Sequence, residues 1–229
     1  MGSKARIAKY ILPIILKDRK PGQWYVEPFV GGANMIDKVD GNRIGADINK
    51  YVIEALTSIR DHIDDLPVNN KQFTELEYGS LRTNDTYPHK GYAGFAFSYG
   101  GKWLGGWCRD SACKRDYVAE AFRNAKDQSP KIKSVIFTNK PYAEIDLPDD
   151  CIIYCDPPYA GTTKYKDNFD HHRFWQWCRE KKSQGHSIFI SEYNAPEDFI
   201  CIKTIKTNTQ LGNGCNTGNQ VKIEKLFTL

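Results

Sequence analysis

The sequence has no hydrophobic run long enough to cross a membrane. Its longest apolar stretch near the start is YILPII at 10–15, whereas a membrane-spanning helix needs about 20 apolar residues. No cleavage-site pattern accompanies this stretch, so we expect no signal peptide, no membrane partner and a cytoplasmic location.

Paired cysteine motifs are also missing. The chain has seven cysteines, none of them spaced as C-x-x-C, which excludes a zinc knuckle and a thioredoxin motif. A metal site built from Cys151, Cys155 and His171 is conceivable, but both cysteines flank an apolar segment. We interpret them as small core residues, expect no metal, and expect reduced thiols.

The composition is that of an ordinary globular protein. The 229 residues are 40% apolar and 26% charged, with a net charge of +4 and a pI near 8.6. This length supports one sizeable core with a smaller insertion. The mildly basic balance permits a polyanionic partner without requiring one.

Apolar and polar patterns predict an α/β fold with a doubly wound, Rossmann-like sheet. The expected helices cover 4–17 (bent or interrupted at Pro13), a segment after the glycines at 31–32, 50–60, 116–126 and 170–185. The expected strands cover 24–26, 43–49, 134–139, 151–155, 186–191, 199–207 and 221–229, and we expect the loop 211–219 to be mobile.

The α/β alternation is interrupted between about 61 and 130, where glycines and aromatic residues dominate. We therefore predict a catalytic and cofactor-binding domain formed by 1–60 and 131–229. The insertion 61–130 would lie beside the ligand crevice and select the substrate.

The segment CIIYCDPPY (151–159) runs an apolar strand directly into an acid, two prolines and a tyrosine. Proline has a fixed φ and no N–H for a β-ladder, so the strand must end here. Asp156 and Tyr159 would be held at the carboxyl edge of the sheet, where open α/β sheets bind ligands. The alternative is a rigid turn with no function.

Two acids suggest the ligand. Asp47 ends the second strand, twenty residues after Glu27, the spacing at which an acid binds ribose hydroxyls in such folds; it could equally be the N-cap of the next helix. The dinucleotide pattern fails because Gly31 and Gly32 are adjacent, and Glu27 would repel a pyrophosphate. S-adenosylmethionine, an adenosine derivative carrying a sulfonium and an ammonium, fits better.

A carboxylate beside a rigid carbonyl suits methylation of an aromatic amine. The carboxylate of Asp156 and the carbonyl of Pro157 would accept the two amine hydrogens and free its lone pair for attack on a sulfonium methyl. Tyr159 would stack on an extruded base, an interaction of about 1–3 kcal/mol. Alignment and hydrogen bonding carry such a reaction, and no metal is required.

Four segments in this order, EPFVGG (27–32), ADIN (46–49), YCDPPY (154–159) and a Gly-Ser-Lys before a helix, resemble the Dam-type (D12 class) DNA adenine-N6 methyltransferases. The short form with GGKWLGGW resembles phage or prophage members, some of which belong to restriction-modification systems. The resemblance implies site-specific methyl transfer from S-adenosylmethionine to N6 of adenine in double-stranded DNA by base flipping, with 61–130 as the target-recognition insertion.

The resemblance also implies roles for individual residues. Asp156 would touch both the cofactor and the target amine, and Tyr159 would hold the flipped adenine. One departure is that no tryptophan precedes the lysine at the start, where the family has Trp-x-Gly-Gly-Lys. The implied cofactor-binding residues are Lys4, Glu27, Phe29, Gly31, Asp47, Ile48 and Asp156.

The insertion carries basic residues among aromatic ones. Trp103 and Trp107 could belong to a DNA-binding loop or to a buried structural one. His171 and His172 are adjacent and point to different helix faces, so we expect a capped helix start there. The expected DNA contacts are Lys102, Arg109, Lys114 and Arg115.

Two other functions stay open. The same geometry would serve methylation of cytosine N4 or another planar amine, although Asp at the first position of D-P-P-Y favours adenine. A catalytically inactive DNA-binding relative is the second alternative, and the missing tryptophan is its only support.

Overall fold

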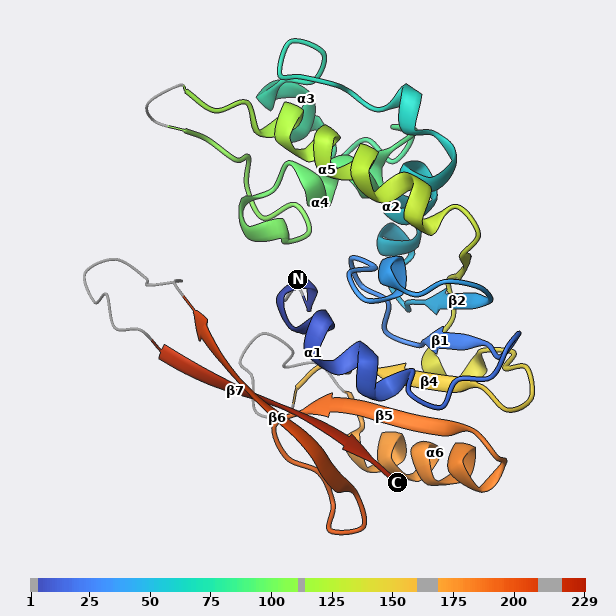
Figure 1. Cartoon of the computed structure of the whole chain (residues 1–229). Helices are drawn as coiled ribbons and strands as arrows, with labels where there is room; N and C mark the ends of the chain where they lie inside the picture. The colour runs from blue at the N-terminus through green and yellow to red at the C-terminus, as the bar shows by residue number, and fades with distance from the viewer. Residues whose placement is uncertain (1–3, 111–113, 160–168, 210–219) are drawn as a thin grey trace.

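A seven-stranded sheet forms the lower half of the molecule (Figure 1) in the computed structural model, which describes residues 4–110, 114–159, 169–209 and 220–229. The strand order is β3-β2-β1-β4-β5-β7-β6. β3 to β5 run parallel in this order, and β7 is antiparallel to both β5 and β6. The strands are β1 (Tyr25–Glu27), β2 (Arg43–Ala46), β3 (Ile136–Thr138), β4 (Ile152–Cys155), β5 (Ser187–Glu192), β6 (Ile200–Thr209) and β7 (Gln220–Thr228). The predicted α/β fold is confirmed.

Helices cover both faces of this sheet, which explains why β1, β2 and β4 are buried along their whole length. On one face Tyr25 and Tyr154 belong to the same cluster as the apolar side of α1 (Ala5–Ile15). On the other, Val26 and Ile153 pack with α6 (His171–Ser183). α1 continues through Pro13 and ends two residues later, so this proline interrupts nothing before the helix end.

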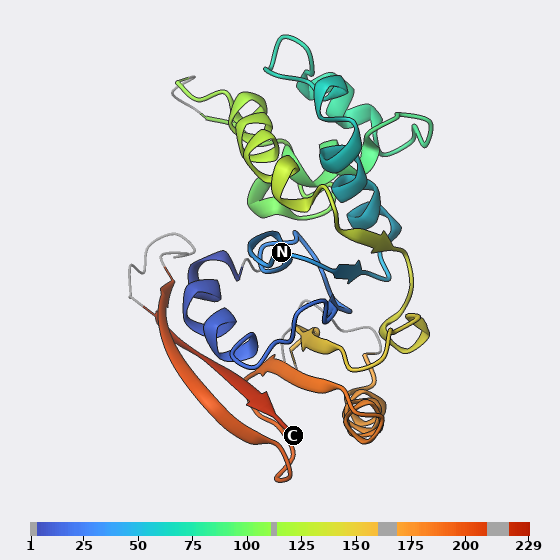
Figure 2. The same ribbon diagram turned by 45° about the vertical axis from the view of Figure 1, so that its right-hand side comes forward.

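A second lobe is helical and lies above the sheet in Figures 1 and 2. α2 packs against α4 and α5, so it belongs by its contacts to this lobe although it directly follows β2. Gly91 allows the close approach, because a Cβ there would lie 2.9 Å from the Ala55 nitrogen. The helices of this lobe are α2 (Lys50–Asp61), α3 (Glu75–Ser80), α4 (Lys90–Ala96) and α5 (Tyr117–Ile132).

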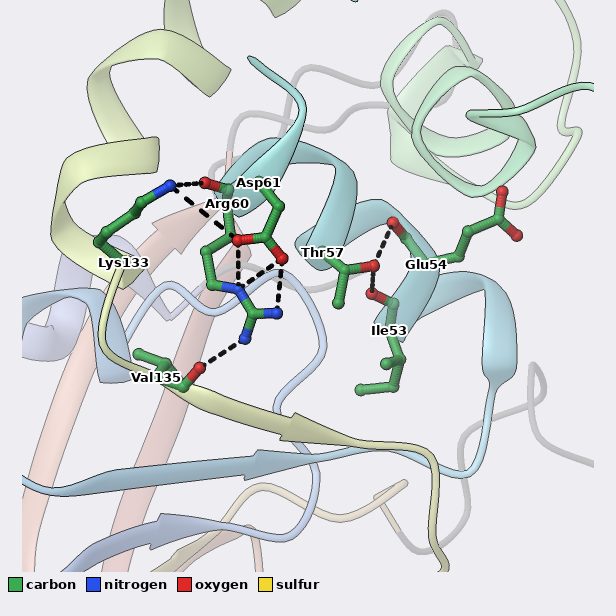
Figure 3. Close-up of polar contacts among 7 residues, drawn as sticks. All are labelled: Ile53, Glu54, Thr57, Arg60, Asp61, Lys133 and Val135. Atoms are coloured by element: carbon green, nitrogen blue, oxygen red, sulfur yellow. Dashed lines mark hydrogen bonds and ion pairs between the residues drawn. The ribbon is translucent and has the colours of Figure 1, made fainter. Parts of the chain in front are cut away.

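The end of α2 is tied to the segment that returns from α5 to the sheet (Figure 3). Arg60 donates from Nη1 to the Val135 carbonyl at 2.7 Å, and Lys133 donates from Nζ to the Arg60 carbonyl at 2.9 Å. Asp61 pairs with the same guanidinium at 2.6 Å. These contacts tie the C-terminal end of α2 to the chain segment that connects α5 with β3.

The structure tests the local predictions for the segment after Gly32 and for the start of α6. The helix predicted after the glycine pair is only a 3₁₀ turn, Ile36–Lys38. The capped start of the helix at 171 is confirmed, because the Asp170 side chain accepts a hydrogen bond from the Arg173 amide at 2.9 Å. The loop 211–219 lies outside the described residues.

Candidate active site

Acidic residues gather where the parallel strands end. Glu27 is the last residue of β1 and is paired with Gly45 of β2, Asp47 follows β2, and Asp156 follows β4. Because parallel strands end at the same edge of a sheet, the topology brings these three acids from distant segments to one edge.

Glu27 is buried, with an exposed fraction of 3%. The Tyr25 hydroxyl donates to its carboxylate at 2.9 Å. Burial raises the pKa of Glu27 well above the usual range, in spite of this hydrogen bond, and the charge of Asp156 raises it further. A cationic ligand nearby would lower this pKa and favour the ionised carboxylate.

Asp47 joins the loop after β1 to the start of α2. One carboxylate oxygen accepts from the Gly31 amide at 3.2 Å and the other from the Asn49 amide at 2.9 Å. Gly31 has φ +48°, a conformation that favours glycine. The N-cap of α2 is Asn49, whose side chain accepts from the Tyr51 amide at 3.0 Å. The alternative that Asp47 caps this helix is therefore wrong.

The neighbouring predicted residues occupy different surroundings. Ile48 has an exposed fraction of 75%, and Asn139 fixes its backbone by donating to the carbonyls of Asp47 at 2.8 Å and Ile48 at 3.0 Å. The Phe29 ring instead packs inward, 5.5 Å from the ring of Tyr142. Ile48 thus presents an apolar side chain at the sheet edge, whereas the Phe29 side chain packs against the hydrophobic core beneath the loop that follows β1.

Asp156 and Tyr159 meet a lysine from the other end of the sequence. The Nζ of Lys4, just before α1, lies 3.4 Å from an Asp156 oxygen and donates to the Tyr159 hydroxyl. The same ammonium lies 2.8 Å from Glu224 of β7, and the Tyr159 hydroxyl donates to Glu224 at 2.7 Å. The resemblance placed Lys4 in the cofactor pocket, and the structure brings it to the D-P-P-Y segment. Sequence reasoning missed Glu224, because it belongs to no motif.

Burial and neighbouring charges perturb these groups. Burial raises the pKa of Asp156 to about 6; Lys4 lowers it and Glu224 raises it. Burial alone would lower the pKa of Lys4, but the carboxylates of Asp156 and Glu224 outweigh it, so this pKa is raised. Lys4 therefore stays charged while Asp156 titrates near neutrality.

These residues fit S-adenosylmethionine better than a phosphate-bearing ligand. Glu27, Asp47 and Asp156 make the carboxyl edge acidic, and Lys4 pairs with Asp156 and Glu224. A ligand with an ammonium and a sulfonium would lower the raised pKa values of Glu27 and Asp156, whereas a pyrophosphate would raise them further.

The predicted DNA contacts lie in and around the helical lobe. Lys102 is exposed, in the turn that follows Tyr99, a tyrosine with an exposed fraction of 68%. Arg109 pairs with Glu75, and Arg115 with Glu120 at 2.6 Å. Lys114 is exposed.

Both tryptophans of this turn pack inward. The Trp103 ring stacks on Tyr51 with centroids 4.0 Å apart, and Trp107 lies 5.5 Å from the Tyr78 ring. The Tyr99 amide donates to the Gly106 carbonyl at 2.8 Å, closing the turn. Packing of the tryptophans therefore leaves Tyr99 and Lys102 at its exposed tip.

The described residues also bear on metal-binding clusters and on membrane-spanning helices. Among the described residues, no group of three or more histidines, cysteines or acids is arranged to hold a metal ion. Cys151 and Cys155 are buried core residues, as predicted. Within the described ranges, no helix combines the length and apolarity that a membrane span needs.

The mixed α/β sheet with its acidic carboxyl edge fits the class of S-adenosylmethionine-dependent methyltransferases. The sequence model of the D12 class N6 adenine-specific DNA methyltransferases matches residues 1–90 and 112–208, which is most of the chain. The protein belongs to this family, and the predicted family and cofactor are confirmed.

Similar solved structures include TrmN from Thermus thermophilus, 10% identical over 98% of this chain and 48% of that one, with a TM-score of 0.41. SMU.472, solved in complex with SAH, is 11% identical to the chain. The match covers 98% of this chain and 52% of that one, with a TM-score of 0.37. The chain spans about half the length of these two proteins. Such distant likenesses establish no shared substrate. No curated protein sequence is significantly similar to the chain.

Proposed function

We propose that the protein methylates N6 of adenine at specific sites in double-stranded DNA and extrudes the target base from the duplex. The observation that carries this proposal is the position of Asp156 at the carboxyl end of β4, 3.4 Å from the Lys4 ammonium. The same ammonium donates a hydrogen bond to the Tyr159 hydroxyl. Family membership supports adenine in DNA as the substrate.

Asp156 and Pro157 would prepare the amine. The lone pair of an exocyclic amine is delocalised into its ring, so the amine is a weak nucleophile. Hydrogen bonds from its two hydrogens to the Asp156 carboxylate and the Pro157 carbonyl would draw the nitrogen towards sp³ geometry. The bound S-adenosylmethionine supplies an electrophilic methyl group on a sulfonium. Glu27 and Asp47 would hold that cofactor through its cationic and hydroxyl groups.

Tyr159 and the helical lobe would hold the DNA. The Tyr159 ring offers a flat surface for a flipped base, and the hydrogen bonds of its hydroxyl anchor the side chain. Lys102, Lys114, Arg109 and Arg115 would contact phosphates or base edges. The exposed Tyr99 lies in the same turn as Lys102.

The proposal is tested by incubating the purified protein with methyl-labelled S-adenosylmethionine and unmethylated duplex DNA, then digesting the DNA and identifying the labelled nucleoside by mass spectrometry. We expect label on N6-methyladenosine. Asp156→Ala is the control: it should abolish transfer and leave DNA binding intact, because it removes an amine acceptor and no phosphate contact.

Each other outcome contradicts a definite part of the proposal. Label on cytosine would favour N4 methylation. Cofactor binding without label would mean a substrate other than DNA amines. Absence of cofactor binding would favour the inactive DNA-binding relative.

A further inference from the structure

Glu224 lies at the centre of the contacts around the D-P-P-Y segment. One of its oxygens, Oε2, accepts from the Lys4 ammonium at 2.8 Å and from the Tyr159 hydroxyl at 2.7 Å. The Tyr159 hydroxyl also accepts from Lys4, so the three groups close a ring of hydrogen bonds beside Asp156. A carboxylate placed this way can control two functional side chains at once.

The sheet explains how Glu224 reaches this position. β7 is antiparallel to β5, and Leu226 is paired with Ser191 and Lys225 with Glu192. Glu224 therefore lies one residue beyond the end of β5, at the edge where Asp156 follows β4. Side chains two residues apart share a face of a strand, and Leu226 packs in the same cluster as α1. Glu224 accordingly meets Lys4 at the start of α1.

We propose that Glu224 is a positioning residue, which anchors the Tyr159 side chain by its hydroxyl where the base would stack and competes with Asp156 for the Lys4 ammonium. This inference rests on the proposed function for the meaning of the Asp156 and Tyr159 positions. Glu224 itself is not expected to touch the reacting atoms.

The geometry supports both effects. Hydrogen bonds on two sides of the Tyr159 hydroxyl anchor that end of the side chain, and the ring packs in an edge-to-face arrangement with Tyr193, with centroids 4.6 Å apart. The Lys4 ammonium lies closer to Glu224, at 2.8 Å, than to Asp156, at 3.4 Å. The side chains of Lys4, Glu224 and Asp156 are 11%, 15% and 22% exposed, so water screens their interactions weakly.

Removing the charge of Glu224 should change the titration of Asp156. Repulsion by Glu224 raises the pKa of Asp156 and attraction by Lys4 lowers it. Without the Glu224 charge the repulsion disappears and Lys4 has one carboxylate to pair with, so both changes lower the pKa of Asp156. Among the described residues, the titratable and charged groups that face this cluster are Lys4 before α1, Glu27 of β1, Tyr154 of β4, Asp156 and Tyr159 after β4, and Glu192 and Tyr193 at the end of β5.

The first measurement is a pH titration of ¹³C-labelled aspartate carboxyls by NMR in the full chain, with Asp156 assigned from the signal missing in Asp156→Asn. In Glu224→Gln the pKa of Asp156 should fall by about one pH unit. In Lys4→Met it should rise. The matched control is Glu197→Gln, the same substitution at an exposed acid outside the site, which should leave the titration unchanged.

Methyl transfer gives the second readout. Glu224→Gln should lower kcat about tenfold and shift the acid limb of the rate profile to lower pH. This kcat loss should largely vanish in a Tyr159→Phe background, because the hydroxyl through which Glu224 acts is then gone. A merely structural role would instead give additive losses and an unshifted limb.

The results separate this inference from the proposed function. An unchanged Asp156 titration in folded Glu224→Gln would overturn the inference whether or not the wild type methylates DNA. A wild type that transfers no methyl to DNA, with the Asp156 titration shifted as expected, would overturn the proposed function alone. Glu224→Asp is the milder variant if Glu224→Gln does not fold; its shorter side chain should lower the pKa of Asp156 by less, and no shift in this folded variant would overturn the inference.

Discussion

Methyl transfer should depend on pH near neutrality, because Asp156 must be ionised to accept hydrogens from the amine. Burial raises the pKa of this carboxyl to about 6, from an ordinary value of 3.8. Because Asp156 is a carboxylic acid, its ionised and active form predominates above its pKa of about 6 and is lost as the pH falls through this value. At pH 7 about 90% of the carboxyl is ionised and at pH 5 about 10%. We therefore expect kcat/KM to fall about tenfold between these two pH values, since this ratio reports the free enzyme.

The assay is initial-rate transfer of labelled methyl to duplex DNA from pH 5 to 8 at constant ionic strength, with both DNA and S-adenosylmethionine subsaturating so that the rate reports the cofactor-free enzyme. DNA binding, followed by fluorescence anisotropy over the same range, is the control for changes in affinity. An Asp156 with the ordinary pKa would still be more than about 90% ionised at pH 5. A profile that stays flat from pH 7 to 5 would therefore refute the reasoning.

Three substitutions test other parts of the structure. Tyr159→Ala should reduce transfer about tenfold or more and Tyr159→Phe less, because the ring provides stacking and the hydroxyl only fixes it; equal losses would contradict this. Asp47→Ala should weaken S-adenosylmethionine binding about tenfold or more in calorimetry, and an unchanged Kd would remove Asp47 from the site. Gly91→Ala should lower the free energy of unfolding by about 1–3 kcal/mol in denaturant, since its Cβ would collide with the α2 backbone. Gly79→Ala, with open space around it, is the matched control and should not destabilise.

Local sequence patterns were enough to predict most of the elements. A short apolar run such as Ile152–Cys155 is typical of a buried strand, and the prolines after Asp156 end it because they lack an N–H. Asp170 caps α6 within three residues of itself. The same local rules misjudged the segment after Gly32, where only a 3₁₀ turn forms. They also left open a cap by Asp47, which Asn49 makes two residues closer to the helix.

The sequence by itself determined which functional side chains stand at strand ends: an acid and a tyrosine after one strand, and a second acid after another parallel strand. Tertiary structure alone decided what surrounds them. Glu224 lies 65 residues from Tyr159 and 220 from Lys4, and nothing in its own segment distinguishes it from a surface acid. The antiparallel pairing of β7 with β5 brings it to the edge where the parallel strands end, and burial there couples four side chains from three distant parts of the chain.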